Sequence, residues 1–389
     1  HVPFVNDDTG NTKLDTSLMS GQPVDVFVSY NVQTFANRQN NNLIEPLNPY
    51  FEKGGFDPKA NFAESALATC KVGDTYYAFP SSVAPNVVFY NKTVMDEKGI
   101  EIKEDWTWDD YREIAKKITT GSGANKKYGS MFYPWGPVMF DYASVELGGN
   151  CYYNAEGLSN FDNPLFAKLL QIQYDMERVD KSQMPLAELI SSKATPHDEF
   201  LKGNCYMFGV TNPWVMWSMK NLKKYPRDFK VAIAPCPRPS KDLSNAWGLG
   251  GTVDWMSIGA KSKNKELAYA FAEFCALEGS VDLAYFRIPG WTKVDIDKCI
   301  NLLLASMDGE NLDPAVDVNK LFDVDSIKKY LFPQNPNYPS EPVITTALAE
   351  VNKIIKEEYE LAMLGEKSIP DAIAAMKKRA DEVISSAKK

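Results

Sequence analysis

Tryptophans that stand beside proline, glycine or asparagine are the residues of this sequence best placed for chemistry. Trp135, Trp214, Trp217, Trp247 and Trp291 fall in such segments, at expected strand ends or loops rather than on helix stripes. An aromatic ring fixed on a stiff loop can present its flat face to a ligand. Sugar rings suit such a face, because their C–H bonds lie on the ring faces and their hydroxyls at the rim. The pattern favours a carbohydrate site, and the alternative for each ring is a place in the core.

The sequence lacks the signatures of several enzyme classes. It has no Walker A sequence, no Gly-x-Ser-x-Gly elbow, no His-Glu-x-x-His and no kinase set. His1 and His197 are its two histidines, and His197 stands where a helix is expected to begin, so we interpret it as a solvated capping residue. Six scattered cysteines never form Cys-x-x-Cys, which favours buried free thiols over zinc or iron–sulfur sites. We therefore expect no catalytic residue, metal site or cofactor.

Length and charge narrow the possible classes further. At roughly 150 residues per domain, the 389 residues correspond to two or three domains. Lys and Arg number 42 against 51 Asp and Glu, a net charge of −9. Nucleic-acid binders usually carry a basic excess, so we expect no nucleic-acid partner. No apolar run approaches the roughly 18 residues that a membrane helix needs.

The elements that must position these residues alternate between strands and helices, which predicts an α/β fold. Buried strands are expected at 24–28, 76–80, 86–91 and 230–235, and the helices between them predict parallel pairing with crossover connections. A capping box, Thr107-Trp108-Asp109-Asp110, opens one helix. A second helix, at 265–278, places Leu267, Phe271, Phe274 and Leu277 in phase on one stripe, and the C-terminal third is wholly helical.

Four passages carry a resemblance to a known family. They are Gly21-Gln22-Pro23-Val24-Asp25-Val26; Gly73-Asp74-Thr75-Tyr76-Tyr77-Ala78-Phe79-Pro80 with Tyr90-Asn91-Lys92 and Thr107-Trp108-Asp109; Phe200-Leu201-Lys202-Gly203-Asn204-Cys205-Tyr206-Met207 with Asn212-Pro213-Trp214; and Ser262-Lys263-Asn264-Lys265-Glu266-Leu267-Ala268. In this order the passages resemble the extracellular solute-binding proteins of ABC importers, in the sugar-type group that includes maltose-binding protein. The sequence departs from the pattern at Val24, which precedes the aspartate, at Tyr206 in place of a small residue, and at Asn212 in place of glycine.

The resemblance implies a two-lobed α/β fold of the periplasmic-binding-protein type, with hinge strands, a central ligand cleft and a helical C-terminus. By position, the N-lobe would comprise residues 1–91 and 257–312, and the C-lobe residues 92–256 and 313–389. Family members begin with a strand and a helix that this sequence does not contain, and residues 2–5 match their second strand. We therefore expect the missing strand and helix upstream in the native protein.

The implied function is high-affinity capture of a carbohydrate, an oligosaccharide, outside the cell and its delivery to the membrane permease of an ABC transporter by lobe closure. A monomer without enzymatic activity is expected, lipid-anchored at the extracellular face of the cell membrane or located in the periplasm. Two alternatives stay open, namely a glycoside-active enzyme and a surface carbohydrate-binding protein without a transport role. A glycoside-active enzyme would need two carboxylates about 5–9.5 Å apart.

By the same resemblance, the ligand would meet residues of both lobes. Those expected in contact with it are Tyr30, Ser81, Ser82, Trp135, Trp214, Trp217, Trp247, Gly250, Arg287, Trp291, Tyr338 and Glu341. The rings of Trp135, Trp214 and Trp247 would stack on sugar faces. Hydrogen bonds to hydroxyls are expected from Ser81, Ser82, Arg287 and Glu341.

Overall fold

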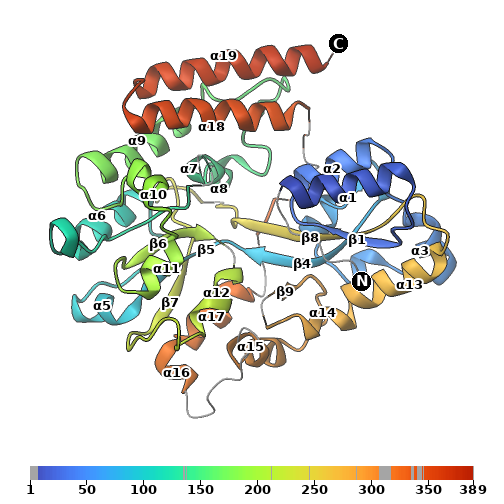
Figure 1. Ribbon diagram of the computed structural model, residues 1–389, viewed down its shortest axis with the longest axis horizontal. Helices are drawn as coiled ribbons and strands as arrows, with labels where there is room; N and C mark the ends of the chain where they lie inside the picture. The colour runs from blue at the N-terminus through green and yellow to red at the C-terminus, as the bar shows by residue number, and fades with distance from the viewer. Residues whose placement is uncertain are drawn as a thin grey trace. The chain divides into compact units, whose positions relative to one another are not determined.

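The structure, a computed structural model, forms two compact units (Figure 1). It describes residues 8–134, 136, 138–211, 213–244, 246–285, 287–305, 317–333, 337–339, 344 and 346–388, without the side chains of residues 8, 9, 210, 217 and 305. Unit 1 comprises His1–Ala84, Gly250–Leu303 and Ser340–Thr345, and unit 2 comprises Pro85–Leu249, Leu304–Pro339 and Thr346–Lys389. The chain passes between the units after Ala84, Leu249 and Leu303, a few residues before the predicted lobe boundaries. Residues 340–345 belong to unit 1.

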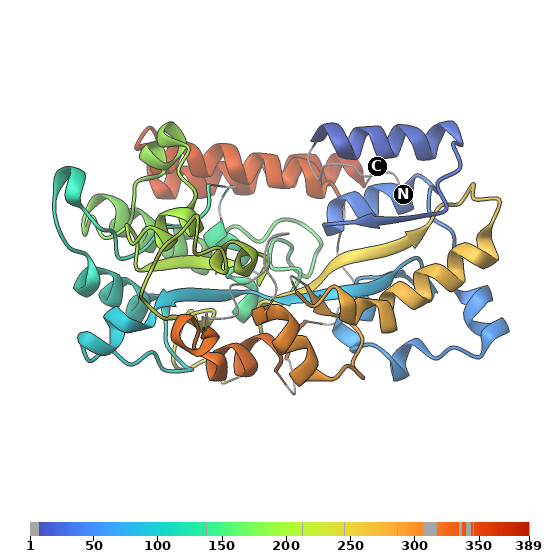
Figure 2. The same cartoon turned by 60° about the horizontal axis from the view of Figure 1, so that its bottom comes forward.

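Unit 1 is built on a sheet with strand order β1-β8-β4-β9. Helices cover both faces, and Figure 2 shows the dark blue α1 and the gold α13 on opposite sides. Phe27 and Phe35 belong to the core on one face, and Phe51, Phe79 and Tyr269 to the core on the other. The elements are α1 (Asp8–Ser20), β1 (Val26–Ser29), α2 (Val32–Asn40), α3 (Asn48–Gly54), η1 (Pro58–Ala60), α4 (Glu64–Ala68), β2 (Lys71–Val72), β3 (Thr75–Tyr76), β4 (Phe79–Pro85), β8 (Gly250–Ile258), α13 (Lys265–Ala276), α14 (Glu278–Asp282), β9 (Ile288–Pro289) and α15 (Ile296–Ala305).

Unit 2 surrounds a second sheet with strand order β6-β5-β7. Phe89 on β5 stacks on Phe208 on β6 with ring centroids 5.0 Å apart. The elements are β5 (Val87–Asn91), α5 (Lys92–Glu97), α6 (Trp108–Ile118), η2 (Gly123–Asn125), α7 (Val138–Asp141), α8 (Ser144–Leu147), α9 (Pro164–Arg178), α10 (Leu186–Ser192), α11 (Pro196–Leu201), β6 (Met207–Thr211), η3 (Pro213–Val215), α12 (Met216–Met219), β7 (Val231–Pro235), α16 (Val318–Leu321), α17 (Val324–Leu331), α18 (Leu348–Leu364) and α19 (Ile369–Ala387). The expected helical C-terminus is confirmed by α18 and α19, which pack on each other.

The predicted parallel pairing is wrong for the ladders that the structure describes. β1 pairs with β8, β4 with β9, and β5 with both β6 and β7, each in the antiparallel sense. Long connections permit either direction, and hydrophobic periodicity carries no information about strand direction. The α/β character was therefore predictable, and the direction of pairing was not.

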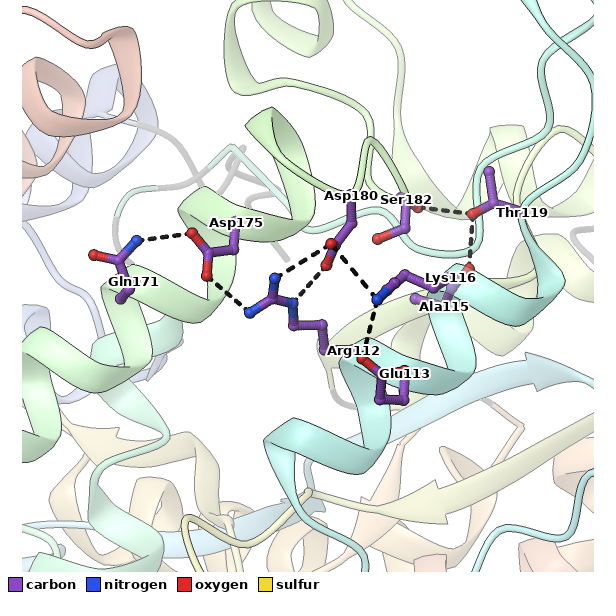
Figure 3. Close-up of polar contacts among 9 residues, drawn as sticks. All are labelled: Arg112, Glu113, Ala115, Lys116, Thr119, Gln171, Asp175, Asp180 and Ser182. Atoms are coloured by element: carbon purple, nitrogen blue, oxygen red, sulfur yellow. Dashed lines mark hydrogen bonds and ion pairs between the residues drawn. The ribbon is translucent and has the colours of Figure 1, made fainter.

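The capping box of α6 is confirmed. The Asp110 N–H donates to Thr107 Oγ1 at 3.2 Å, and the Thr107 N–H donates to Asp110 Oδ2 at 2.9 Å. One turn later the Arg112 side chain joins α6 to the end of α9, as Figure 3 shows. Its Nε donates to Asp180 Oδ2 at 2.5 Å and its Nη1 to Asp175 Oδ2 at 2.8 Å. This charged network holds α6 against the end of α9 within unit 2.

Most of the predicted apolar stripe of α13 faces away from the core of unit 1. Leu267, Phe271 and Phe274 are 72%, 56% and 53% exposed, and only Leu277 among the four residues of the stripe is buried. Helix α13 instead turns a narrower face of mostly small residues, Ala268, Tyr269, Ala272 and Ala276, toward the core. Small side chains let a helix approach a sheet closely, so the larger residues point outward.

Candidate functional site

A polar cluster in unit 1 lies across three neighbouring strands, β8, β4 and β9. Asp254 on β8 accepts a hydrogen bond from Ser82 Oγ of β4 through its Oδ2. The same oxygen accepts from Nε of Arg287, which immediately precedes β9, at 2.9 Å. Ser81 Oγ donates to the main-chain oxygen of Asp254 at 3.1 Å. Hydroxyl, carboxylate and guanidinium groups therefore meet at one place in the sheet.

Glycine makes this close approach of strands possible. A Cβ at Gly290 would lie 1.9 Å from the carbonyl oxygen of Pro80, so a larger residue would push β9 away from β4. Ser82 pairs with Pro289 and Val83 with Ile288 in the antiparallel ladder, which places Arg287 beside the C-terminal end of β4. Strand β8, which pairs with the other edge of β4, begins with Gly250 and Gly251. Their φ angles of 154° and 151° are ones that residues with a side chain rarely adopt.

The other carboxylate oxygen of Asp254, Oδ1, is buried and has no hydrogen-bond partner among the described residues. A buried acceptor without a donor costs about 1–3 kcal/mol, so this atom favours an incoming N–H or O–H group. The carboxylate charge of Asp254 also acts on the phenol of Tyr30, which directly follows β1. Burial, and secondly the charge of Asp254, raise the pKa of the Tyr30 phenol, which stays neutral and can donate a hydrogen bond.

An aromatic cluster in unit 2 lines a pocket of about 380 Å³. Trp214 in η3 lies against His197 of α11 in an edge-to-face arrangement, with centroids 5.2 Å apart. The Tyr133 hydroxyl and His197 Nδ1 are 3.0 Å apart, within hydrogen-bond distance. The pocket is also lined by Pro134, Leu189, Ile190, Lys193, Ala194, Thr195 and Pro196. It offers flat ring faces, a phenol and an ammonium group.

His197 is not the solvated cap that its sequence context predicted. Thr195 is the N-cap of α11, and the His197 side chain is only 12% exposed. Burial lowers the pKa of the imidazole, against the opposing charge of Asp198, whose Oδ1 lies 3.4 Å from Nε2. The helix starts near the predicted place, but long-range packing against Tyr133 and Trp214 encloses the ring.

A second pocket of unit 2, of about 250 Å³, contains Trp247 and Tyr338. The Trp247 N–H donates to the Val145 carbonyl at 2.9 Å, which holds the loop before β8. Gly248 lies under the Tyr338 ring, where an added Cβ would come within 2.6 Å of Cε1. Polar lining comes from Asn86, Glu104, Arg238, Lys329 and Asn337. With Tyr330, which also lines it, the pocket combines three aromatic rings with hydrogen-bonding groups.

The structure brings the predicted residues into separate groups. Tyr30, Ser81, Ser82 and Arg287 gather around Asp254, Trp214 lies in the first aromatic pocket, and Trp247 and Tyr338 share the second. Gly250 begins β8. Trp135, Glu341 and the side chain of Trp217 lie outside the described residues.

Trp291 is placed differently from the other described tryptophans of the prediction. Its Nε1 donates to Asn61 Oδ1 at 3.2 Å, and its ring packs against the core of unit 1. The ring of Trp291 is therefore partly buried against this core, which is closer to the alternative named above for each tryptophan.

Sequence reasoning missed Asp254, Tyr133 and His197. Asp254 is a charged residue within the apolar run Val253-Asp254-Trp255-Met256 of a strand, and that interruption is a signal that could have identified it. Tyr133 stands two residues before Trp135, in the same proline-containing segment. For His197, nothing in its neighbourhood distinguishes a buried ring from a solvated one.

Within the described part of the chain, no group of three or more His, Cys, Asp or Glu side chains is arranged to hold a metal ion. None of the described helices is both long and apolar enough to span a membrane. The six cysteines are free, and all but Cys275 are buried, as the sequence indicated.

Two curated relatives of this chain have names that specify a sugar ligand. An arabinooligosaccharide-binding protein of Bacillus subtilis is 26% identical over 266 residues, which are 67% of this chain and 58% of the relative. A protein of the same name from Halalkalibacterium halodurans is 24% identical over 257 residues, 64% of this chain and 52% of the relative. The chain thus spans just over half the length of the curated relatives it matches.

Solved structures resemble the chain along nearly its whole length. An ABC substrate-binding protein of Listeria monocytogenes in complex with cycloalternan has a TM-score of 0.73 at 20% identity, covering 98% of this chain and 90% of that one. UgpB from Mycobacterium tuberculosis with glycerophosphocholine has a TM-score of 0.74 at 16% identity, covering 100% and 90%. These likenesses confirm the expected two-lobed periplasmic-binding-protein-like fold. The family model described as bacterial extracellular solute-binding protein matches residues 2–281, and the chain belongs to that family.

Proposed function

We propose that this protein captures an oligosaccharide outside the cell and delivers it to the membrane permease of an ABC transporter. The family supports solute capture, and the two curated relatives, whose names specify arabino-oligosaccharides, support a carbohydrate. Delivery would depend on closure of the two lobes on the ligand, a movement established for periplasmic binding proteins. A monomer, held by a lipid at the extracellular face of the cell membrane or free in the periplasm, fits this role.

The observation that carries the proposal is the buried, unpartnered Oδ1 of Asp254 beside Arg287 and Ser82. A sugar hydroxyl can donate to a carboxylate in a charge-assisted hydrogen bond, which is stronger than a neutral one. Asp254 and Arg287 balance each other in charge, so the cluster suits a neutral polyol better than an anionic ligand. The ammonium and phosphate groups of an ionic solute would meet no unbalanced charge here.

The aromatic residues of unit 2 support the same ligand class. Trp214, Tyr133 and His197 present rings beside polar groups in a pocket whose volume suits a sugar residue. Ring faces bind the C–H surfaces of a pyranose or furanose, and they do so with little selectivity among sugars. Stacking thus provides affinity, while the polar cluster provides selectivity among hydroxyl patterns.

Isothermal titration calorimetry with a ligand panel tests the proposal. The panel comprises arabino-oligosaccharides, malto-oligosaccharides, their monosaccharides and glycerophosphocholine, and intrinsic tryptophan fluorescence is followed in parallel. We expect micromolar or tighter binding of at least one oligosaccharide, with weaker binding of its monosaccharide. Binding of glycerophosphocholine alone, or of no oligosaccharide, would contradict the proposal. Chromatography of the recovered sugar should show it intact, whereas shortened products would indicate a glycoside-active enzyme.

A further inference from the structure

A chain of polar contacts runs through the wall of the Trp214 pocket of unit 2. The Tyr225 hydroxyl, from the loop between α12 and β7, donates to Oδ1 of Asp198 on α11. The same oxygen lies 3.4 Å from Nε2 of His197. On the other side of the imidazole, Nδ1 lies 3.0 Å from the Tyr133 hydroxyl. Tyr133 and His197 line the pocket, whereas Asp198 and Tyr225 are not among its lining residues.

Asp198 carries the negative charge of this chain of contacts. Burial acts to raise the pKa of its carboxyl, but hydrogen bonding from Tyr225, supported by the charge of Lys224, outweighs burial and holds that pKa below its ordinary value. Burial lowers the pKa of the His197 imidazole, so near neutral pH the ring is uncharged and carries a single proton. That proton lies either on Nδ1, beside Tyr133, or on Nε2, beside the carboxylate.

The carboxylate determines which of the two ring nitrogens is protonated. A negative oxygen 3.4 Å from Nε2 stabilises a proton there, and Nδ1 is then left as an acceptor. Since Nδ1 is 3.0 Å from the Tyr133 oxygen, the hydroxyl of Tyr133 is the donor of that hydrogen bond. With the opposite tautomer, an unprotonated Nε2 would face the Asp198 oxygen, and the two acceptors would repel each other.

A phenol has one proton, so a Tyr133 hydroxyl that donates to Nδ1 meets any further group only as an acceptor. We propose that Asp198 and Tyr225 are positioning residues of this pocket: they keep the His197 proton on Nε2, and the Tyr133 oxygen thereby accepts a hydrogen bond from a hydroxyl of the bound sugar. The sugar in this inference rests on the proposed function, whereas the placement of the proton does not. The pocket would favour a free sugar hydroxyl at Tyr133 over a ring or glycosidic oxygen, which has no proton to donate.

Nitrogen-15 NMR of the histidine-labelled protein identifies the protonated ring nitrogen. The sequence has two histidines, His1 and His197, and the resonances that His197→Gln removes belong to the second. At about pH 8, where the imidazole is neutral, we expect the proton on Nε2 in the unsubstituted protein and a mixture of tautomers in Asp198→Ala. Asp141→Ala is the matched control, because Asp141 also accepts a tyrosine hydroxyl in unit 2, that of Tyr152 at 2.5 Å. It should leave the tautomer unchanged.

Calorimetry with arabinotriose, or with maltotriose if only malto-oligosaccharides bind, tests whether Asp198 acts through Tyr133. We expect Tyr133→Phe to weaken binding about fivefold, as the loss of one hydrogen bond would, and Asp198→Ala to weaken it by less. The double variant should bind no more weakly than Tyr133→Phe, because Asp198 has no effect once the hydroxyl is absent.

Two results would overturn the inference. One is a proton on Nδ1 of the unsubstituted protein, or a tautomer that Asp198→Ala does not change. The other is a double variant whose losses multiply, since Asp198 would then act on the pocket independently of the Tyr133 hydroxyl. A proton on Nε2 in a protein that binds no sugar of the panel would support the role of Asp198 and contradict the proposed function instead.

Discussion

The candidate ligand groups of unit 1 lie on adjacent strands, whereas those of unit 2 lie on short helices and loops. In unit 1, Ser82, Asp254 and Arg287 are held at hydrogen-bond distance by the pairing of β8, β4 and β9. In unit 2, Trp214 and His197 come from η3 and α11, and ring packing sets their positions. The first region is polar, and its groups are held at fixed hydrogen-bond distances. The second is aromatic, and its ring contacts depend less on exact position.

This difference follows from what each interaction demands. A hydrogen bond weakens steeply when its donor and acceptor move out of line, so its groups need the rigid frame of a sheet. Contact with a ring face varies little with small displacements, so loops and short helices can supply it. We therefore expect changes in unit 2 to alter overall affinity, and changes in unit 1 to alter the choice among sugars.

Removal of the Trp214 indole should have the largest effect on binding. Trp214→Ala is expected to weaken oligosaccharide binding at least about tenfold, because it removes stacking area and opens the pocket. Trp214→Phe should recover part of the loss for every sugar alike. Calorimetry gives both affinities, with Trp291→Phe as the control, since the Trp291 ring packs against the core of unit 1 and its substitution should change stability only. Unchanged affinity of Trp214→Ala would remove Trp214 from the site.

Neutralisation of Asp254 should have a smaller but more selective effect. Asp254→Asn keeps the shape of the side chain and removes the charge that strengthens the bond from a hydroxyl, so we expect about a fivefold loss of affinity. The loss should differ among sugars that differ in one hydroxyl. Asp25→Asn is the matched control, because Asp25 also accepts a serine hydroxyl, that of Ser262 at 2.5 Å, in the same unit. If both variants reduced affinity equally, the comparison between the two regions would fail.

The network around Arg112 should affect stability without affecting binding. Arg112→Ala leaves the largely buried Asp180 carboxylate without its closest cation, and we expect a loss of about 1 kcal/mol in the free energy of unfolding. Urea titration gives this value, and calorimetry should show unchanged affinity. A loss of affinity would indicate that the α6–α9 contact positions the aromatic residues of unit 2.

Acid should destabilise the aromatic cluster of Trp214, Tyr133 and His197, and this is the smallest of the four effects predicted. Burial lowers the pKa of His197 below its ordinary 6.5, although Asp198 opposes this and Lys224 adds to it. The unfolded chain then binds the proton more tightly, so this contribution to stability is complete above pH 6.5 and is lost as the pH falls below it. Melting curves between pH 8 and pH 5 should show a decline that His197→Gln reduces. An identical decline in the variant would exclude His197 as its source.

The resemblance to the family named part of the candidate site. It implied Ser81, Ser82, Arg287 and Trp214, and in the structure Ser81 bonds to the main chain of Asp254, while Ser82 and Arg287 bond to its carboxylate. That carboxylate, Asp254, was missed because its partners lie 172 residues before it on β4 and 33 after it near β9. Pairing between distant strands is not written in any local window.

The tryptophans illustrate the same limit. Trp214 and Trp291 share a neighbouring proline or glycine, and the local signal for both is a ring on a stiff loop. Trp214 lies in a pocket, whereas Trp291 donates to Asn61 and packs against the core of unit 1. What separates them is the surface that the rest of the chain brings to each ring.

The sequence by itself determined the capping box of α6 and the alternation that makes an α/β fold, because these depend on contacts within a few residues. It also determined family membership through motifs in a fixed order. Only the tertiary structure decided strand direction, the partners of Asp254 and the outward orientation of Phe271 and Phe274. A helix with apolar residues on two faces can bury either one, and close packing of small residues against a sheet determines which face it buries.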